Sequence, residues 1–376
     1  MLKVLKMTGI VLSIILFLGF LSTIIFIKVS PQFGGSHGED DRMRYRESGH
    51  YQQGKFLNDI PTSMEMSAKE GFKVAMEFFR GVPNSAPDFE LPLEKRDPLV
   101  LAKNNGSPHL IWFGHSAFLL QIDGKNILID PMLGDVPSPH PWLGKSRFSK
   151  ELPIAIEQLP PIDAIIISHD HYDHLDYGSI QKLKDKTSMF FVPLGVGAHL
   201  EAWGIPEDKI RELNWWEEAV HEEIRLVFTP ARHFSGRGLN DRWTTMWGSW
   251  VIRSPSKNIY FSGDSGYGPH FKTIGDKYGP FDFAMMECGQ YNERWHAIHM
   301  MPEETAQAAV DVQARQMMPI HWGAFTLALH SWTDPVERVT KEAEKLNMPV
   351  SVPRIGEIID LNDLESVEKA GKWWVK

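Results

Sequence analysis

The stretch SHDHYDHLD, from Ser168 to Asp176, places three histidines and three aspartates within nine residues, directly behind the apolar run AIII. A solvated loop of polar composition is the ordinary explanation for such a cluster. The spacing favours a metal site instead, because His169 and His171 stand two residues apart on a turn that leaves a strand, where both can converge on one ion. Asp173 and His174 can then face a second ion. Imidazole suits zinc and carboxylate suits zinc or iron, so the stretch predicts a metal site with room for two ions.

A site for two ions needs more ligands, and three candidates follow predicted strands further along the chain. His233 comes after IRLVFTPAR, Asp264 follows NIYFSG, and His321 follows MMPI. Strand ends that face one edge of a sheet are where sites gather on α/β scaffolds. A single histidine after a strand is more often an ordinary core or surface residue, so each candidate is weak alone. Taken with SHDHYDHLD and in this order, they match a known pattern of metal ligands.

The composition limits the classes of function. The chain has 376 residues, 43% of them hydrophobic, which is enough for a sizeable core. Its formal net charge is −9, and it has no basic stripe that would indicate a nucleic acid partner. Cys288 is the one cysteine, which excludes an internal disulfide and the cysteine-rich zinc modules. Any metal must therefore be held by histidine and carboxylate.

The first 28 residues form a separate segment. An uncharged, mostly apolar run extends from Met7 to Ile27, with Lys3 and Lys6 before it and Lys28 after it. A membrane-spanning helix needs about 20 such residues, whereas the apolar part of a signal peptide usually has about 7–15. We therefore predict an uncleaved single-pass anchor in preference to a removed signal peptide. The amino-terminal lysines favour a cytoplasmic amino terminus and an exported catalytic domain, in the periplasm or outside the cell.

Residues 29–94 are expected to form a tether or a surface wrap. The first part is polar and carries Gly34 and Gly35. The segment Ser63–Arg80, SMEMSAKEGFKVAMEFFR, repeats its apolar residues at roughly helical spacing. We expect a helix that packs on the main domain. The alternative is an amphipathic element at the membrane that helps a lipid to enter.

Residues 95–376 predict a mixed α/β domain. HLIWF, AFLLQI and NILID indicate early strands, with a hairpin turn at Asp123-Gly124. Further apolar strands then alternate with helical stretches, including PEETAQAAVDVQAR, which has proline in its first turn and acidic residues just after it. Many strands with interspersed helices are typical of a layered α/β architecture.

Several longer segments resemble one enzyme family. WFGHSAFLLQIDGKNILIDP, LPPIDAIIISHDHYDHLDY, ELNWWEE, FTPARHFSGR and PIHWGAF are together similar to N-acylphosphatidylethanolamine-hydrolysing phospholipase D and its bacterial relatives, over residues 95–360. The resemblance implies a metallo-β-lactamase-type αββα sandwich, two zinc ions at one edge of the β layers, and a homodimer. Another divalent metal at one of the two positions is the alternative to zinc.

The resemblance also assigns the ligands. It implies that His169, His171 and His233 hold one zinc ion, that Asp173, His174 and His321 hold the other, and that Asp264 bridges both. Every ligand position carries the expected residue type, which argues for an enzyme and against a non-catalytic sensor or scaffold. Two divalent ions that share a water lower its pKa towards neutrality, so that the resulting hydroxide can attack a phosphodiester. Asp173 or Asp264 is the candidate acceptor for the proton of that water.

Other residues are candidates for substrate contact. The resemblance places His299 beside the site, where it would contact the substrate phosphate or protonate the leaving group. Tyr172, inside the metal motif, and Gln290 are further substrate-binding candidates. Asp130, which ends a predicted strand, and His115 are expected to brace the metal loop through hydrogen bonds.

The sequence therefore predicts a membrane-anchored, binuclear-zinc phosphodiesterase. Its expected reaction is the hydrolysis of N-acylphosphatidylethanolamine-like phospholipids to phosphatidic acid and N-acylethanolamine. The alternative is an enzyme of the same fold that acts on a soluble phosphodiester or a sugar-phosphate lactone. A β-lactamase and a nuclease are disfavoured, because the motifs around the ligands and the acidic charge balance point elsewhere.

Overall fold

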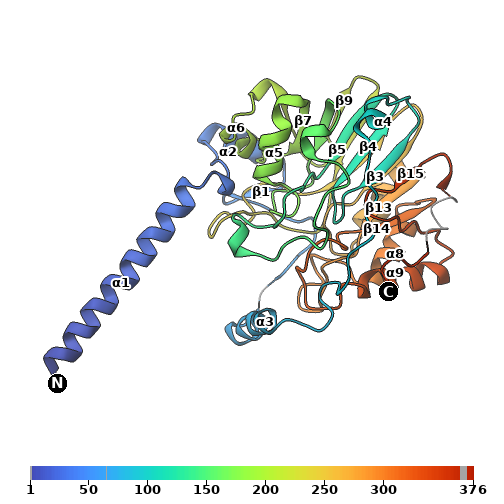
Figure 1. The fold of residues 1–376 in the computed structure, drawn as a ribbon. Helices are drawn as coiled ribbons and strands as arrows, with labels where there is room; N and C mark the ends of the chain where they lie inside the picture. Colours follow the sequence, from blue (N-terminus) through green and yellow to red (C-terminus); the bar gives the residue numbers. More distant parts are fainter. Residues whose placement is uncertain (1, 65, 365–370) are drawn as a thin grey trace.

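Two stacked β-sheets form the centre of the molecule (Figure 1). The computed structural model describes residues 2–64, 66–364 and 371–376. The first sheet has the strand order β15-β3-β4-β5-β6-β7-β8 and the second β14-β13-β12-β11-β10-β9. The strands of the first sheet are β3 (His109–Trp112), β4 (Phe118–Ile122), β5 (Lys125–Ile129), β6 (Ile162–Ile166), β7 (Thr187–Pro193), β8 (Ile210–Leu213) and β15 (Ile358–Asp360). Those of the second are β9 (Glu218–His221), β10 (Ile224–Thr229), β11 (Ser249–Arg253), β12 (Asn258–Phe261), β13 (Phe283–Glu287) and β14 (Met317–Ile320).

The central strands are apolar on both faces because both faces are covered. In β3, Leu110 and Trp112 belong to the core between the sheets, whereas Ile111 belongs to a second core on the outer face. Successive side chains of a strand point to opposite faces, so alternate residues of β3 enter different cores. Continuous apolar runs such as AIII follow from burial on both sides.

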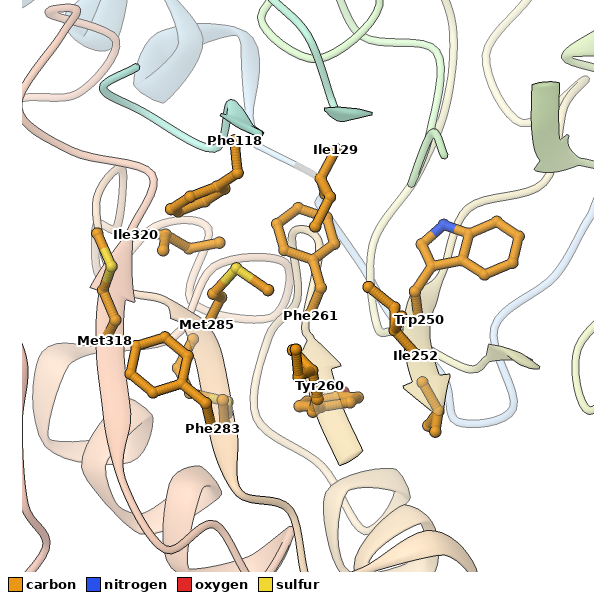
Figure 2. Close-up of a cluster of buried hydrophobic side chains, with 14 of the residues drawn as sticks. Phe118, Ile129, Trp250, Ile252, Tyr260, Phe261, Phe283, Met285, Met318 and Ile320 are labelled. Atoms are coloured by element: carbon orange, nitrogen blue, oxygen red, sulfur yellow. The ribbon is translucent and has the colours of Figure 1, made fainter. Parts of the chain in front are cut away.

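The core between the sheets is built from large side chains. Phe118 and Ile129 of the first sheet approach Phe261 and Ile320 of the second (Figure 2). The rings of Phe118 and Phe261 meet edge to face, with their centroids 6.5 Å apart. Edge-to-face pairs stabilise a core beyond the burial of apolar area alone.

Helices cover both outer faces of the stacked sheets. Helices α5 (Tyr177–Leu183) and α6 (Gly197–Ala202) pack on the outer face of the first sheet. Helices α7 (His270–Tyr278), α8 (Pro302–Asp311) and α9 (Asp334–Lys345) cover the second (Figure 1). A short helix, α4 (Pro98–Ala102), precedes β3. The predicted αββα sandwich is confirmed.

The amino-terminal segment begins with a long exposed helix. Helix α1 (Leu2–Val29) extends away from the sandwich, and its stretch Lys6–Val29 is long and apolar enough to cross a membrane (Figure 1). Residues 30–58, here called the N-terminal strap, then lie against the sandwich. The strap contains α2 (Glu39–Arg46) and the hairpin of β1 (Tyr51–Gln52) and β2 (Lys55–Phe56). Its Tyr45 and Phe56 are buried in the core, so this segment is a wrap and not a free tether.

Helix α3 (Ala68–Arg80) differs from the expected packed helix. It starts after Ser67, whose side chain accepts a hydrogen bond from the Glu70 amide while the Glu70 carboxylate accepts from the Ser67 amide. This reciprocal cap explains why the helix begins five residues later than the pattern of apolar residues indicated. None of its residues is buried, and Phe72 and Phe79 are 70% and 86% exposed.

Candidate metal centre

The candidate ligands converge because each follows the carboxyl end of a strand. Strands β5, β6 and β7 are parallel, and so are β12, β13 and β14. SHDHYDHLD follows β6, His233 follows β10, Asp264 follows β12, and His321 follows β14 directly. The carboxyl ends of parallel strands meet at one edge of a sheet, so segments distant in sequence meet here.

One group of ligand atoms comprises His169, His171, His233 and Asp264. The Nδ1 atom of His171 lies 2.9 Å from His169 Nε2 and 3.2 Å from His233 Nε2. The Oδ2 atom of Asp264 lies 3.8 Å from the Nε2 atoms of both His169 and His233. Two nitrogen ligands of one tetrahedral zinc ion lie about 3.3 Å apart, given zinc–nitrogen distances of about 2.0–2.1 Å. The four atoms therefore have the separations that a shared ion requires.

A second group lies on the other side of Asp264. His321 Nε2 is 3.1 Å from both Asp173 Oδ2 and Asp264 Oδ2. His174 Nε2 is 3.5 Å from Asp173 Oδ2 and 3.2 Å from Asp264 Oδ1. His115, which was expected only to brace the metal loop, belongs to this group as well, with Nε2 2.9 Å from Asp173 Oδ2. The Asp264 carboxylate thus lies near histidines of both groups.

The polar atoms of this cluster fit a metal better than they fit one another. Within the described part of the chain, the buried His174 Nε2 and Asp264 Oδ1 make no hydrogen bond of good geometry, although they lie 3.2 Å apart. Buried polar atoms are almost always satisfied, so orphaned atoms of this kind indicate a site for a further partner such as a metal ion. Imidazole nitrogens and carboxylate oxygens are the donors that zinc and similar divalent ions prefer.

Burial and charge favour the deprotonated, metal-binding form in three of these residues, whereas the neighbouring carboxylates raise the pKa of His174 and His321. Burial places the pKa of His169 and His233 well below the ordinary value, which keeps both rings neutral. Burial would raise the pKa of Asp264, but its attraction to His174 and His321 holds that pKa well below the usual range. Ligands must be deprotonated to bind a metal, and burial and neighbouring charges favour that form in these three residues.

Hydrogen bonds behind the ligands fix their rings. The carboxylate of Asp130 accepts from the Ser168 amide and lies 2.7 Å from His174 Nδ1, as its predicted bracing role requires. His233 Nδ1 lies 3.0 Å from the carbonyl oxygen of Ile298. When Nδ1 is engaged from behind, Nε2 is the nitrogen that faces the ion.

The substrate-contact candidates divide into two kinds. His299 lies at the rim, where it forms a group with Asp264 and His321 and its ring stacks 5.2 Å from that of His321. The hydroxyl of Tyr172 donates to the carbonyl of Arg237, and its ring is partly exposed. Gln290 departs from our expectation, because its amide is engaged by backbone.

The side chain of Gln290 donates to the carbonyl oxygen of His321 at 3.2 Å and accepts from the Leu327 amide at 3.1 Å. It is also buried. Both functional atoms are therefore used to hold the loop after β14, and we do not retain Gln290 as a substrate-binding residue.

Sequence reasoning missed two acidic residues at the site. Glu287, the last residue of β13, is buried and contacts both His299 and His321. Asp170, between the first two histidines of the motif, is buried and accepts from the Gly236 amide and the Thr245 hydroxyl. An acidic residue at the end of an otherwise apolar strand is the one signal that could have identified Glu287.

Comparison with known proteins places this geometry in a family. Residues 125–322, more than half of the chain, match the model of the beta-lactamase superfamily domain. An uncharacterized protein of Mycobacterium tuberculosis is 40% identical over 336 residues, which cover 88% of this chain and 89% of that protein. N-acyl-phosphatidylethanolamine-hydrolyzing phospholipase D 1 of Caenorhabditis elegans is 34% identical over 228 residues, covering 57% of this chain and 64% of that enzyme.

Among solved structures, an isothiocyanate hydrolase from Delia radicum gut bacteria matches with a TM-score of 0.52 and 21% identity, over 66% of this chain and 98% of that one. At this identity the match shows the shared fold. The family model, the histidines at the strand ends and the two metal-binding groups all indicate a metal-dependent hydrolase. The chain belongs to the metallo-β-lactamase superfamily and is one of its metal-dependent hydrolases.

Proposed function

We propose that this protein is a membrane-anchored, two-zinc phosphodiesterase that hydrolyses N-acylphosphatidylethanolamine-like phospholipids. The products are phosphatidic acid and an N-acylethanolamine. Similarity to the C. elegans phospholipase D supports the substrate class. The position of the candidate membrane helix is the structural observation that carries the proposal.

Helix α1 ends beside the metal motif. The Phe26 ring, in its last turns, lies 4.8 Å from that of His140 and 6.0 Å from that of Trp142, which is 70% exposed. Just after the helix, the Phe33 ring meets the edge of Tyr172 at 6.5 Å. A bilayer around α1 would therefore lie next to the loop that carries the histidines, which suits a substrate that stays in the membrane.

The proposed ligands are drawn from the two groups of atoms, without His115, which keeps the bracing role predicted for it. His169, His171 and His233 would hold one ion, Asp173, His174 and His321 would hold the other, and Asp264 would supply an oxygen to each. When bound, the two ions supply an activated water and neutralise charge on the phosphate. Asp173 and Asp264 are carboxylates within this cluster and can accept the proton of the attacking water.

His299 completes the proposed reaction. Its Nδ1 lies 3.1 Å from the Glu287 carboxylate, which leaves Nε2 to meet the substrate. As water oxygen bonds to phosphorus, the bond from phosphorus to the ethanolamine oxygen breaks. We assign His299 to contact the phosphate and to protonate that leaving oxygen. The lysines before α1 favour placing this site on the exported face of the membrane.

The test uses detergent-purified full-length protein and vesicles that contain N-acylphosphatidylethanolamine. Phosphatidic acid and N-acylethanolamine are measured for the native chain, for Asp264→Ala and for the matched control Asp208→Ala. Asp208 precedes β8, at the opposite edge of the first sheet, and is exposed. We expect both products from the native chain and the control, and a loss of at least about 10²-fold in Asp264→Ala, which removes a ligand shared by both ions.

A native chain that holds two metal ions and releases neither product would overturn the lipid assignment. Soluble phosphodiesters and sugar-phosphate lactones would then be the next substrates. Equal activity of Asp264→Ala and the native chain would overturn the proposed role of Asp264.

A further inference from the structure

We propose that the N-terminal strap is a working part of the metal centre, with Asn58 as the positioning residue for His233. The strap connects α1 to the sandwich and touches the metal loops at three separate places. This inference rests on the metal centre of the proposed function and not on its lipid substrate, so a failure of the lipid assignment alone would leave it standing.

The first contact fixes the backbone of a proposed ligand. The Asn58 side chain donates through Nδ2 to the His233 carbonyl at 2.8 Å, and its Oδ1 accepts from the His233 amide at 3.1 Å. The same Oδ1 accepts from the Trp247 indole at 3.2 Å. One side chain thus holds the peptide groups on both sides of His233. Because Ile298 engages the ring from behind, neither the backbone nor the ring of His233 is left to adjust.

The second contact passes through a buried histidine. The Gly35 amide donates to His199 Nδ1 at 3.0 Å, so the proton of a neutral His199 must sit on Nε2. That nitrogen lies 3.3 Å from Oδ2 of Asp170, the residue between the first two histidines of the motif. A Cβ atom on Gly35 would lie 2.1 Å from the Ala198 carbonyl oxygen, so the close approach requires glycine.

The third contact is a buried guanidinium group. Arg237 donates through Nε and Nη2 to the Gln32 carbonyl, at 3.0 and 2.8 Å. Its Nη1 donates to the carbonyl oxygens of Asp170 and Leu175, at 2.5 and 2.8 Å. Arg237 therefore ties the start of the strap to both ends of the loop that carries His171, Asp173 and His174.

These contacts have a common consequence. Removing a residue that supports a metal ligand lowers metal affinity or activity by about 10–100-fold. The strap supplies such support from the segment that follows the candidate membrane helix. A displaced strap should therefore loosen the centre, beginning with the ion held by His233.

The experiment measures metal binding by the full-length, detergent-solubilised protein. Asn58→Ala is compared with the control Asn214→Ala, which removes a different asparagine side chain that is hydrogen-bonded to the strap. The Asn214 side chain donates to the Ser48 carbonyl at 3.1 Å and touches none of the proposed ligands. Zinc affinity is read by competition with a chelator, and the visible spectrum of the cobalt-substituted protein reports the geometry around each ion.

We expect Asn58→Ala to bind one of its two zinc equivalents about tenfold more weakly and to change the cobalt spectrum. Asn214→Ala should keep both affinities and the native spectrum. Native affinities and spectrum in Asn58→Ala would overturn the proposal, as would equal losses in both variants. If Asn58→Ala does not fold, the isosteric Asn58→Asp replaces it. This variant keeps the acceptor for the His233 amide, turns the donor to the His233 carbonyl into a repelling carboxylate oxygen, and is judged by the same two readouts.

Discussion

Glu287 connects the two sides of the candidate site. Its carboxylate lies 3.1 Å from His299 Nδ1 and 3.4 Å from His321 Nδ1, and it also accepts from the Met300 amide. One fully buried carboxylate thus orients a proposed ligand and the proposed general acid together. Its position at the carboxyl end of β13 places it directly behind the metal centre.

We predict that Glu287→Gln lowers metal affinity or activity by about 10–100-fold, because the amide does not offer both histidine rings a charged acceptor. Metal content and turnover measure the effect, and thermal unfolding checks that the fold survives. Glu212→Gln is the matched control, since Glu212 is also an enclosed carboxylate, but its partners are Arg44 and the amides of Gly195 and Gly197. An equal loss in both variants would contradict a specific role for Glu287.

The candidate ligands could be predicted from sequence, whereas their supports could not. Four of them lie in SHDHYDHLD, and the other three each follow a recognisable strand. Asn58 lies 175 residues before His233, and no local pattern pairs the two. Gln290 illustrates the same limit, because its sequence position near the site said nothing about the backbone groups that engage its amide.

At the scale of elements, α3 carries an apolar face that is largely exposed. Phe72, Ala75, Met76 and Phe79 recur at helical spacing, and the two phenylalanines are strongly exposed. The opposite side of α3 contacts the loop between β13 and α8. Glu77 forms an ion pair with Arg294 of this loop, and Phe78 stacks on Trp295. Figure 1 shows α3 on the side from which α1 extends. This arrangement suits a helix that lies in the surface of the membrane.

We predict that the double variant Phe72→Gln/Phe79→Gln loses about tenfold or more of its activity on vesicles. Burying one phenylalanine contributes about 1.5–3 kcal/mol, and 1.4 kcal/mol corresponds to a factor of ten. Activity on lipid dispersed in detergent should stay near the native value. Lys69→Gln/Lys73→Gln, on the charged side of α3, is the control. Unchanged activity on vesicles in the phenylalanine variant would contradict a role for α3 at the membrane.

The elements that sequence predicted and those it missed differ in how they are buried. The apolar stretches AFLLQI and MMPI predicted the strands β4 and β14 with bounds close to those observed. Helix α2 was missed because its sequence, EDDRMRYR, is almost wholly polar and buries only Tyr45. Strand β9 was missed because it is an edge strand with alternately exposed residues and little apolar content. Periodicity reports burial, so weakly buried elements escape it.

At the scale of the whole molecule, the candidate metal centre joins the two sheets. His169, His171, Asp173 and His174 follow a strand of the first sheet, whereas His233, Asp264 and His321 follow strands of the second. Both groups of ligand atoms draw on both sheets. Bound metal would therefore close the open edge of the sandwich, much as a crosslink would.

We predict that removing the metal lowers the thermal unfolding temperature, because an ion that binds only the folded chain adds its binding free energy to the stability. At a free metal concentration about 100 times Kd this amounts to about 2.7 kcal/mol, which lowers Tm by roughly 5 °C. Differential scanning calorimetry of the detergent-solubilised protein, before and after dialysis against a chelator, measures the shift. Added zinc should restore it in the native chain and restore less of it in Asp264→Ala, which lacks the carboxylate between the two groups. An unchanged Tm, with metal analysis showing that both ions have left, would mean that the sheets hold this edge together without metal. The metal would then serve the chemistry alone.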